Sequence, residues 1–502
     1  MKSYRNLPVY KTVPIFLSLP VTKIVIHMRN FAILFFASSL TLMAFSQQTN
    51  NAVFGKYFTN KTMRFDYFHS GTATEEHFSM DRILNDGSWA GSKLVLRDDL
   101  NRGLYFFEII EPKSGTLIYS RGFASIFGEW QTIPEAASNW GAFHETIRFP
   151  WPNETVKLVI KKRDAKNNFV EIWNTQIDPT ARYVNPSELK SNYKSFTYIE
   201  NGPSQNHVDI VILGDGYTQS EMGKFRKDVE RLTDELFAVE PYKSRKLDFN
   251  VRAVETPSAT SGVNKPHPGV FNRTPLSMSY GAFDSERYAL AYDNRTIRDV
   301  ASTVPYDHMF ILINENTYGG GGIFNLYSTV AVDNKFSDYI FVHEFGHSFA
   351  ALADEYYTSD VSYETPEITV EPWEPNVTAL FDPSNLKWKD LLTAGTPIPT
   401  PWDKEKFDIF SYGIQNERRA IRAAKEPESV MESLFERERK EMISMIDKME
   451  FKKATGAFEG ANYMPRGMYR SAIDCIMFTR NHQEFCPACT KGILEVIDQY
   501  NK

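Results

Sequence analysis

The sequence predicts an α+β protein of more than one domain, in which an N-terminal β-sandwich is followed by an α/β domain. The chain has 502 residues, of which 42% are hydrophobic and 24% are charged; this is the composition of a folded globular protein. Residues 53–177 contain short runs of aromatic and β-branched residues separated by turns. After residue 205, such runs alternate with helical patterns. All-β and α/β regions are therefore expected in succession.

The N-terminus has the pattern of a cleaved signal peptide. Residues 31–45 are apolar apart from small hydroxyl residues, with Arg29 before them and Ala44-Phe45-Ser46 at their end. This run of about 15 residues is shorter than the roughly 20 needed to cross a bilayer. We expect residues 1–46 to be a signal peptide with an upstream extension before Met28; a membrane anchor or a buried helix is the alternative. The mature chain should be secreted, periplasmic or at the cell surface, without stable membrane insertion.

Residues 48–180 are expected to form the β-sandwich. Runs such as TMRFDYF at 62–68, KLVLRDD at 93–99 and FVEIWNTQI at 169–177 are rich in strand-forming residues and are bounded by turn signals, as in all-β domains. The histidines of this region are scattered, so no catalytic group is expected in it. Residues 181–204 are polar and contain prolines, which predicts a linker.

Residues 205–502 are expected to form the second domain. Its expected strands are 208–213, 249–254, 307–314 and 327–332. One helix is expected after the first strand, with Ser220 as its N-cap, and another is expected from about Ser337. Strands that alternate with helices indicate an α/β domain. The densely charged stretch 403–453 is expected to be helical, with a solvated face.

The residues with metal chemistry lie in one helical segment, YIFVHEFGHSFAALADEYY at 339–357. His343 and His347 are four residues apart, so they lie on one face of a helix and can bind one metal ion. Glu344 is displaced from that face and is expected to act as a general base on a metal-bound water. The alternative is a core helix with two satisfied histidines. It is disfavoured because burying these groups without a metal costs free energy.

A catalytic zinc site needs three protein ligands and an open position for water. Asp354 is the expected third ligand, since carboxylates are accepted zinc ligands. A known zinc-peptidase pattern places this ligand one position earlier, where Ala353 stands in this chain. The chain is therefore expected to leave the helix just before the aspartate, so that its side chain can turn back. Glu355 and His482 are the alternatives.

Two features outside this helical segment are also candidates. Residues 319–322 are glycines that precede an expected strand. They predict either an edge strand that pairs with an extended substrate or a flexible loop. Met477 is the candidate for a methionine turn beneath the metal, and Met431 is the weaker one. Methionine is also an ordinary core residue.

The chain has three cysteines, Cys475, Cys486 and Cys489. The last two form a CxxC motif, which is found in redox pairs and in zinc sites. A Cys₄ zinc site would need a second pair, and only Cys475 remains. In an exported protein we expect a disulfide that joins Cys475 to one of the other two.

The charge balance argues against a nucleic-acid-binding protein, because 56 basic and 63 acidic residues give a net charge of −7. Three classes of function stay open. The first is a zinc-dependent peptidase acting on a protein or peptide. The second is a non-catalytic binder of surface glycans or proteins, suggested by aromatic residues such as Trp130 and Trp140. The third is a zinc amidase acting on cell-wall peptide. The oligomeric state is not predicted.

Four strings carry a resemblance to a known family. They are MRFDYFHSG at 63–71, DIVILGDGYT at 209–218, HEFGHSFAALADEY at 343–356 and FCPAC at 485–489. In combination they resemble the IgA-peptidase family of secreted zinc metallopeptidases (metallopeptidase family 64), over nearly all of the mature chain. The resemblance implies a β-sandwich followed by a zincin/metzincin-like α/β metallopeptidase domain. It also implies zinc bound by His343, His347 and Asp354, with Glu344 as general base. Residues 403–453 match no family motif and are interpreted as an insertion.

Overall fold

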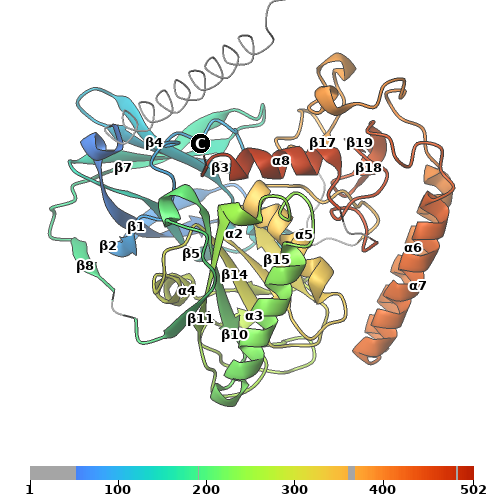
Figure 1. The fold of residues 1–502 in the computed structure, drawn as a ribbon, viewed down its shortest axis with the longest axis horizontal. Coiled ribbons are helices and arrows are strands. Elements are labelled where there is room, and N and C mark those ends of the chain that lie inside the picture. The colour runs from blue at the N-terminus through green and yellow to red at the C-terminus, as the bar shows by residue number, and fades with distance from the viewer. Residues whose placement is uncertain (1–52, 190, 360–367, 482–483, 502) are drawn as a thin grey trace, which may run out of the picture. The chain divides into compact units, whose positions relative to one another are not determined.

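The computed structural model describes residues 53–189, 191–359, 368–481 and 484–501 (Figure 1). The predicted signal peptide and His482 lie outside these ranges. Within them, no helix is both long enough and apolar enough to cross a membrane. The described strands form five sheets, two of them in the N-terminal region and one large sheet in the C-terminal region.

The N-terminal region consists of two four-stranded sheets over one core. One sheet has the order β5-β1-β2-β8 and the other β4-β3-β6-β7. The strands of the first sheet are β1 (Phe58–Gly71), β2 (Glu76–Ser88), β5 (Gly141–Pro152) and β8 (Val184–Glu188). Those of the second are β3 (Tyr105–Glu111), β4 (Thr116–Phe123), β6 (Val156–Arg163) and β7 (Phe169–Ile177). Phe65 and Ile147 of the first sheet share a buried cluster with Ile109 and Leu158 of the second. The two sheets therefore pack face to face, as in a sandwich.

The prediction of a strand over 93–99 is wrong. The Ser92 hydroxyl accepts hydrogen bonds from the backbone N–H groups of Leu94 and Val95. The Arg121 guanidinium donates to the backbone carbonyls of Val95 and Leu96. Side chains therefore use the backbone groups that a sheet ladder would need. The expected linker also differs, because residues 181–204 contain strand β8 and strand β9 (Lys194–Ile199).

The C-terminal region is built on a six-stranded sheet of order β15-β16-β14-β10-β11-β9. Its strands are β10 (Val208–Asp215), β11 (Phe249–Glu255), β14 (His308–Ile313), β15 (Gly320–Ile323) and β16 (Tyr327–Ala331), together with β9. The neighbouring strands from β11 to β16 are parallel, and both edge strands run antiparallel to their neighbours. All residues of the four parallel strands are buried. The sheet is therefore covered on both faces, as in α/β proteins.

Helices cover this sheet on both sides. Helices α3 (Met222–Leu236), α5 (Ser337–Ala350) and α8 (Pro487–Ile497) contribute to one core cluster. Helix α4 (Asn294–Ala301) contributes to another. A short 3₁₀ turn precedes α3. Its capping box is formed by Thr218 and Glu221, so Ser220 is not the N-cap that the sequence indicated. Smaller elements are α2 (Ile126–Trp130), β12 (Met278–Ser279), β13 (Leu290–Ala291), β17 (Val377–Thr378), β18 (Phe458–Ala461) and β19 (Met464–Arg470).

The charged stretch 403–453 forms two long helices, as predicted. Helices α6 (Lys404–Ala423) and α7 (Glu428–Ile446) lie side by side (orange in Figure 1). One face of the pair is buried, and Phe407, Ile414 and Phe435 belong to the same core cluster as α5. The pair is therefore packed on the α/β core as well as solvated.

Candidate metal centre

Helix α5 carries both predicted histidine ligands and ends shortly after the second one. Ala351 follows the helix with a left-handed backbone, φ 56°. The N–H of Ala351 bonds to the His347 carbonyl, and the N–H of Leu352 bonds to the Gly346 carbonyl. This is the bonding of a helix C-cap that reverses the chain. The expected break before Asp354 is therefore confirmed.

The reversal brings the Asp354 carboxylate between the two imidazoles. Asp354 Oδ1 lies 3.0 Å from His343 Nε2 and 3.3 Å from His347 Nε2, and the two nitrogens are 3.2 Å apart. A tetrahedral zinc ion with bonds of about 2.0 Å has ligand-to-ligand edges of about 3.3 Å. Asp354 Oδ1 is buried and has no hydrogen-bond partner within the described residues. The three ligand atoms fit a zinc ion.

The second nitrogen of each imidazole is held by a backbone carbonyl. His343 Nδ1 lies 3.0 Å from the carbonyl oxygen of Ile476, and His347 Nδ1 lies 2.6 Å from that of Leu352. Only a protonated ring nitrogen donates to a carbonyl, so the proton of each ring is on Nδ1. Each Nε2 then keeps its lone pair for a metal, which is the usual outer-shell arrangement of zinc sites. The Tyr463 hydroxyl donates to Asp354 Oδ2.

The electrostatics of these groups favour a cation. Burial alone would lower the pKa of His347, but the Asp354 carboxylate raises it to about 9. Burial would raise the pKa of Asp354, but the two histidines hold it well below its usual range. These shifts mean that positive charge is stabilised between the two groups, and a divalent metal ion bound there would supply it. Burial raises the pKa of Glu344.

Strand β15 lies directly against α5, and its glycines make this approach possible. A Cβ on Gly322 would lie 2.4 Å from the carbonyl oxygen of Glu344 and 2.9 Å from His347 Cβ. A Cβ on Gly320 would lie 3.4 Å from Glu344 Cγ. The glycines therefore form the edge strand that was one of the two expectations, not a flexible loop. The Gly320 backbone already bonds to residues 287 and 289.

The four predicted site residues line a cavity of about 610 Å³. Its walls come from the N-terminal region, from the segment before α4, from the loop after α5 and from the helix pair α6–α7. Lining residues from these four parts include Glu129, Arg287, Tyr288, Tyr356, Gln415 and Met442. The predicted insertion thus forms part of the cavity wall.

Two polar side chains beside the candidate ligands were not anticipated from the sequence. Arg287 donates a hydrogen bond of 3.3 Å to the Tyr356 hydroxyl. The Tyr356 ring is nearly parallel to that of His343, at 6.3 Å between centroids. Tyr356 could have been suspected because it follows Asp354 by two residues. Arg287 is remote in sequence, and no local pattern marks it.

The other candidates occupy distinct places. Met477 is buried, and its Sδ would lie 2.9 Å from a Cβ on Gly346, so it packs against α5 beneath the histidines. Met431 lies in α7. Glu355 points away from the histidines, because its Oε1 lies 3.1 Å from Asn376 Nδ2 and beside two cysteines.

The predicted disulfide is wrong for this structure. All three cysteines are free thiols, and Cys475 Sγ lies 3.8 Å from Cys489 Sγ. A disulfide bond needs about 2.05 Å between the two sulfurs, and here the Glu355 carboxylate packs against two of the thiols instead. No local pattern marks this arrangement, because Glu355 is far from the cysteines along the chain.

Comparison with known families agrees with this geometry. The model of the family described as IgA Peptidase M64 matches residues 197–497, and that of the Peptidase M64 N-terminus matches residues 53–174. The chain belongs to the M64 family of metallopeptidases. This M64 peptidase is therefore a peptide-bond hydrolase with protein or peptide substrates, and the predicted resemblance is confirmed. No curated protein sequence matches the chain.

Proposed function

We propose that this M64 peptidase is a secreted zinc-dependent endopeptidase, with His343, His347 and Asp354 as zinc ligands and Glu344 as general base. The observation that carries the proposal is the convergence of three ligand atoms at 3.0 to 3.3 Å from one another. They line a cavity large enough for several residues of a peptide. Since all three proposed ligands line this cavity, the zinc ion would face it.

When bound, zinc supplies Lewis acidity, which polarises a scissile carbonyl and favours ionisation of water near neutral pH. Glu344 lies one residue from His343, lines the same cavity and has a pKa raised by burial. It would take the proton of the attacking water and pass it to the leaving amine. Arg287 and the Tyr356 hydroxyl are donors in this cavity, and they would stabilise negative charge on the carbonyl oxygen.

We also propose a zincin-like catalytic domain, in which the insertion 403–453 helps to form the substrate cleft. This is supported by the antiparallel edge strand β15 against the metal helix and by Met477 beneath it. The free part of the β15 edge would pair with an extended substrate. Export through a signal in residues 1–46 is part of the proposal. Amino-terminal sequencing of protein from the culture medium or periplasm should find a start near Gln47, whereas an uncleaved cell-bound chain would contradict it.

The test of the mechanism is Glu344→Gln. The variant should keep its zinc while turnover of an unfolded protein such as casein falls by about 10³-fold, because the proton acceptor is lost. Zinc is measured by elemental analysis and turnover by release of new amino termini. Glu154→Gln, at an exposed site far from the cavity, is the matched control and should have wild-type activity.

Three other outcomes would overturn the proposal. Unchanged turnover in Glu344→Gln would rule out the general base. Hydrolysis of cell-wall stem peptides, without cleavage of casein, would favour the amidase. A wild-type chain that neither binds zinc nor cleaves peptides, but whose N-terminal region binds glycans or proteins, would favour the binding protein.

A further inference from the structure

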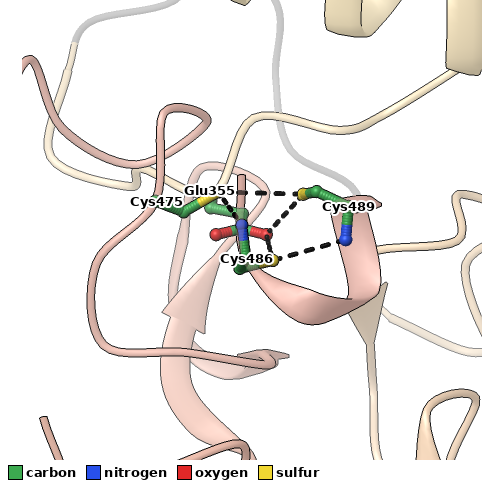
Figure 2. A group of neighbouring side chains, drawn as sticks. All are labelled: Glu355, Cys475, Cys486 and Cys489. Carbon is green, nitrogen blue, oxygen red and sulfur yellow. Dashed lines mark hydrogen bonds between the residues drawn. The ribbon is translucent and has the colours of Figure 1, made fainter. Parts of the chain in front are cut away.

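A second group of metal-ligand side chains lies outside the His343 centre, and the proposed reaction does not use it. Glu355, Cys475, Cys486 and Cys489 converge from three segments of the chain (Figure 2). Glu355 lies in the loop after α5, Cys475 in a turn, and the last two at the start of α8. All four are at most 3% exposed. Their ligand atoms all lie within 4.8 Å of one another.

The distances in this group match those around one zinc ion. Cys475 Sγ lies 3.8 Å from Cys489 Sγ. Glu355 Oε1 lies 3.3 Å from Cys486 Sγ and 3.2 Å from Cys489 Sγ. With Zn–S bonds of about 2.3 Å and Zn–O bonds of about 2.1 Å, a tetrahedral site has S–S edges of about 3.8 Å and S–O edges of about 3.6 Å. Small shifts of these side chains would bring all four ligand atoms to bonding distance from one zinc ion.

The Glu355 carboxylate forms no ion pair with a cationic side chain in the described part of the chain, and only its Oε1 has hydrogen-bond partners. Glu355 Oε2 is buried and has no hydrogen-bond partner within the described residues. Arg470 is buried nearby and acts on this carboxylate through space, but its guanidinium donates hydrogen bonds to the backbone carbonyls of Glu459, Gly460 and Ile473. An uncompensated buried carboxylate costs several kcal/mol, and a cation at the convergence point would remove that cost.

Two of the cysteine sulfurs, those of Cys475 and Cys486, accept hydrogen bonds from the groups around them. The backbone N–H groups of Cys486 and Met477 donate to Cys475 Sγ at 3.2 and 3.4 Å. The Ser471 hydroxyl donates to Cys486 Sγ at 3.0 Å, and the Cys489 N–H donates to it at 3.4 Å. Cys486 is also the N-cap of α8, where the helix dipole stabilises negative charge. Zinc binds cysteine as the thiolate.

We propose that Cys475, Cys486, Cys489 and Glu355 bind a second zinc ion, which is structural. Thiolates select zinc over magnesium and calcium, and a site with four protein ligands leaves no position for a substrate. A disulfide between any two of the cysteines would leave the third thiol beside an unneutralised carboxylate. A zinc ion would bind all three sulfurs and the Glu355 carboxylate together.

This ion would also help to orient two of the proposed ligands of the other site, His343 and Asp354. Glu355 follows the ligand Asp354 directly, and its N–H donates to the Met477 carbonyl at 2.8 Å. Ile476, between two of these residues, supplies the carbonyl that fixes His343 Nδ1. The second ion thus ties together the segments that orient two ligands of the first. Its binding does not depend on the proposed reaction.

The first test is the zinc content of the full chain, purified without chelator. Wild type should hold about two zinc ions per chain, and both Cys489→Ser and His347→Ala should hold about one. His144→Asn is the control and should keep both. His144 belongs to a third group of potential ligands, with Asp66 and Asp81, which arginines already neutralise.

Zinc contents of the wild type and the two variants show which of the two proposed sites is absent. One zinc per wild-type chain that is lost in His347→Ala and kept in Cys489→Ser would overturn the second site and leave the first. One zinc with the opposite dependence would overturn the zinc ligands of the proposed function and leave the second site.

A second measurement uses only wild-type protein, in case Cys489→Ser does not fold. A mercurial reagent titrated into the native chain should release about one of the two zinc ions as the thiols react. The Co²⁺-substituted protein should show thiolate-to-cobalt charge-transfer absorption. Mass analysis after alkylation under denaturing conditions should count three free thiols. A disulfide with no mercurial-released zinc would overturn the proposal.

Discussion

The N-terminal and C-terminal regions both bury charged groups, but they neutralise them differently. In the N-terminal sheet, the buried Arg64 pairs with Asp66 and Asp86, each at 2.9 Å. In the C-terminal region, Asp354 Oδ1 and Glu355 Oε2 are buried without hydrogen-bond partners in the described part of the chain. The former charges are balanced by arginine side chains, whereas a metal ion at each of the two proposed sites would balance the latter. The difference separates a stabilising network from candidate metal sites.

The largest effects on zinc affinity and on stability are expected when one buried aspartate is removed from each region, first Asp354 and then Asp66. In Asp354→Ala, zinc affinity at the His343 centre should fall by more than the roughly 100-fold that loss of an outer-shell partner costs. Peptidase activity should be lost with it. Competition with a chelator of known affinity measures the zinc affinity, and casein cleavage measures the activity.

Asp66→Ala is the matched comparison. It leaves Arg64 buried with one partner fewer, so the free energy of unfolding should fall by about 3 to 5 kcal/mol, with zinc content unchanged. Denaturant unfolding measures this loss. If Asp66→Ala lost zinc, or if Asp354→Ala kept it, the contrast between the two regions would be wrong.

The next effect is a pH dependence of the free energy of unfolding, caused by the buried His69 and its two glutamate partners. His69 is buried, with Nδ1 at 2.9 Å from Glu145 and Nε2 at 2.8 Å from Glu76. Burial would lower the pKa of His69, but Glu145 and Glu76 raise it above its usual value. The stabilisation from protonated His69 is therefore complete below the unfolded pKa of about 6.5. It is lost as the pH rises through the higher pKa of the folded state.

His69→Gln should accordingly lower the free energy of unfolding by about 3 kcal/mol at pH 6, and by less at high pH. Urea unfolding across this range measures the change, with the zinc content followed in parallel. His77→Gln is the control, because the side chain of His77 is 59% exposed. A loss that is the same at every pH would show that His69 is buried neutral.

The smallest effect sharpens the description of the metal centre. Tyr463→Phe removes the hydroxyl that donates to Asp354 Oδ2, and leaves all three proposed ligands in place. Zinc affinity should fall by about 10-fold, since outer-shell partners orient ligands without binding the metal. Stability without metal should change little. A fall as large as that in Asp354→Ala would mean that Tyr463 has a more direct part in the site.

Local patterns predicted those elements whose formation depends on near neighbours. The run FVEIWNTQI became β7 over the same residues, and α5 begins at the predicted Ser337. The strands β2 and β5 were not anticipated; both pair with β1, which is a contact that no local run records. Residues 93–99 have strand propensity, but the side chains of Ser92 and Arg121 bind their backbone.

The sequence by itself determined which residue types could carry the chemistry. His343, Glu344 and His347 are related by the helical repeat, which is a property of a few consecutive residues. Only the tertiary structure decided what completes each group. It turned Asp354 toward the histidines and Glu355 toward the cysteines, although the two are adjacent in sequence, and it placed Arg287 beside Tyr356. Such contacts join segments far apart in the chain, so packing of the whole core fixes them and no local spacing records them.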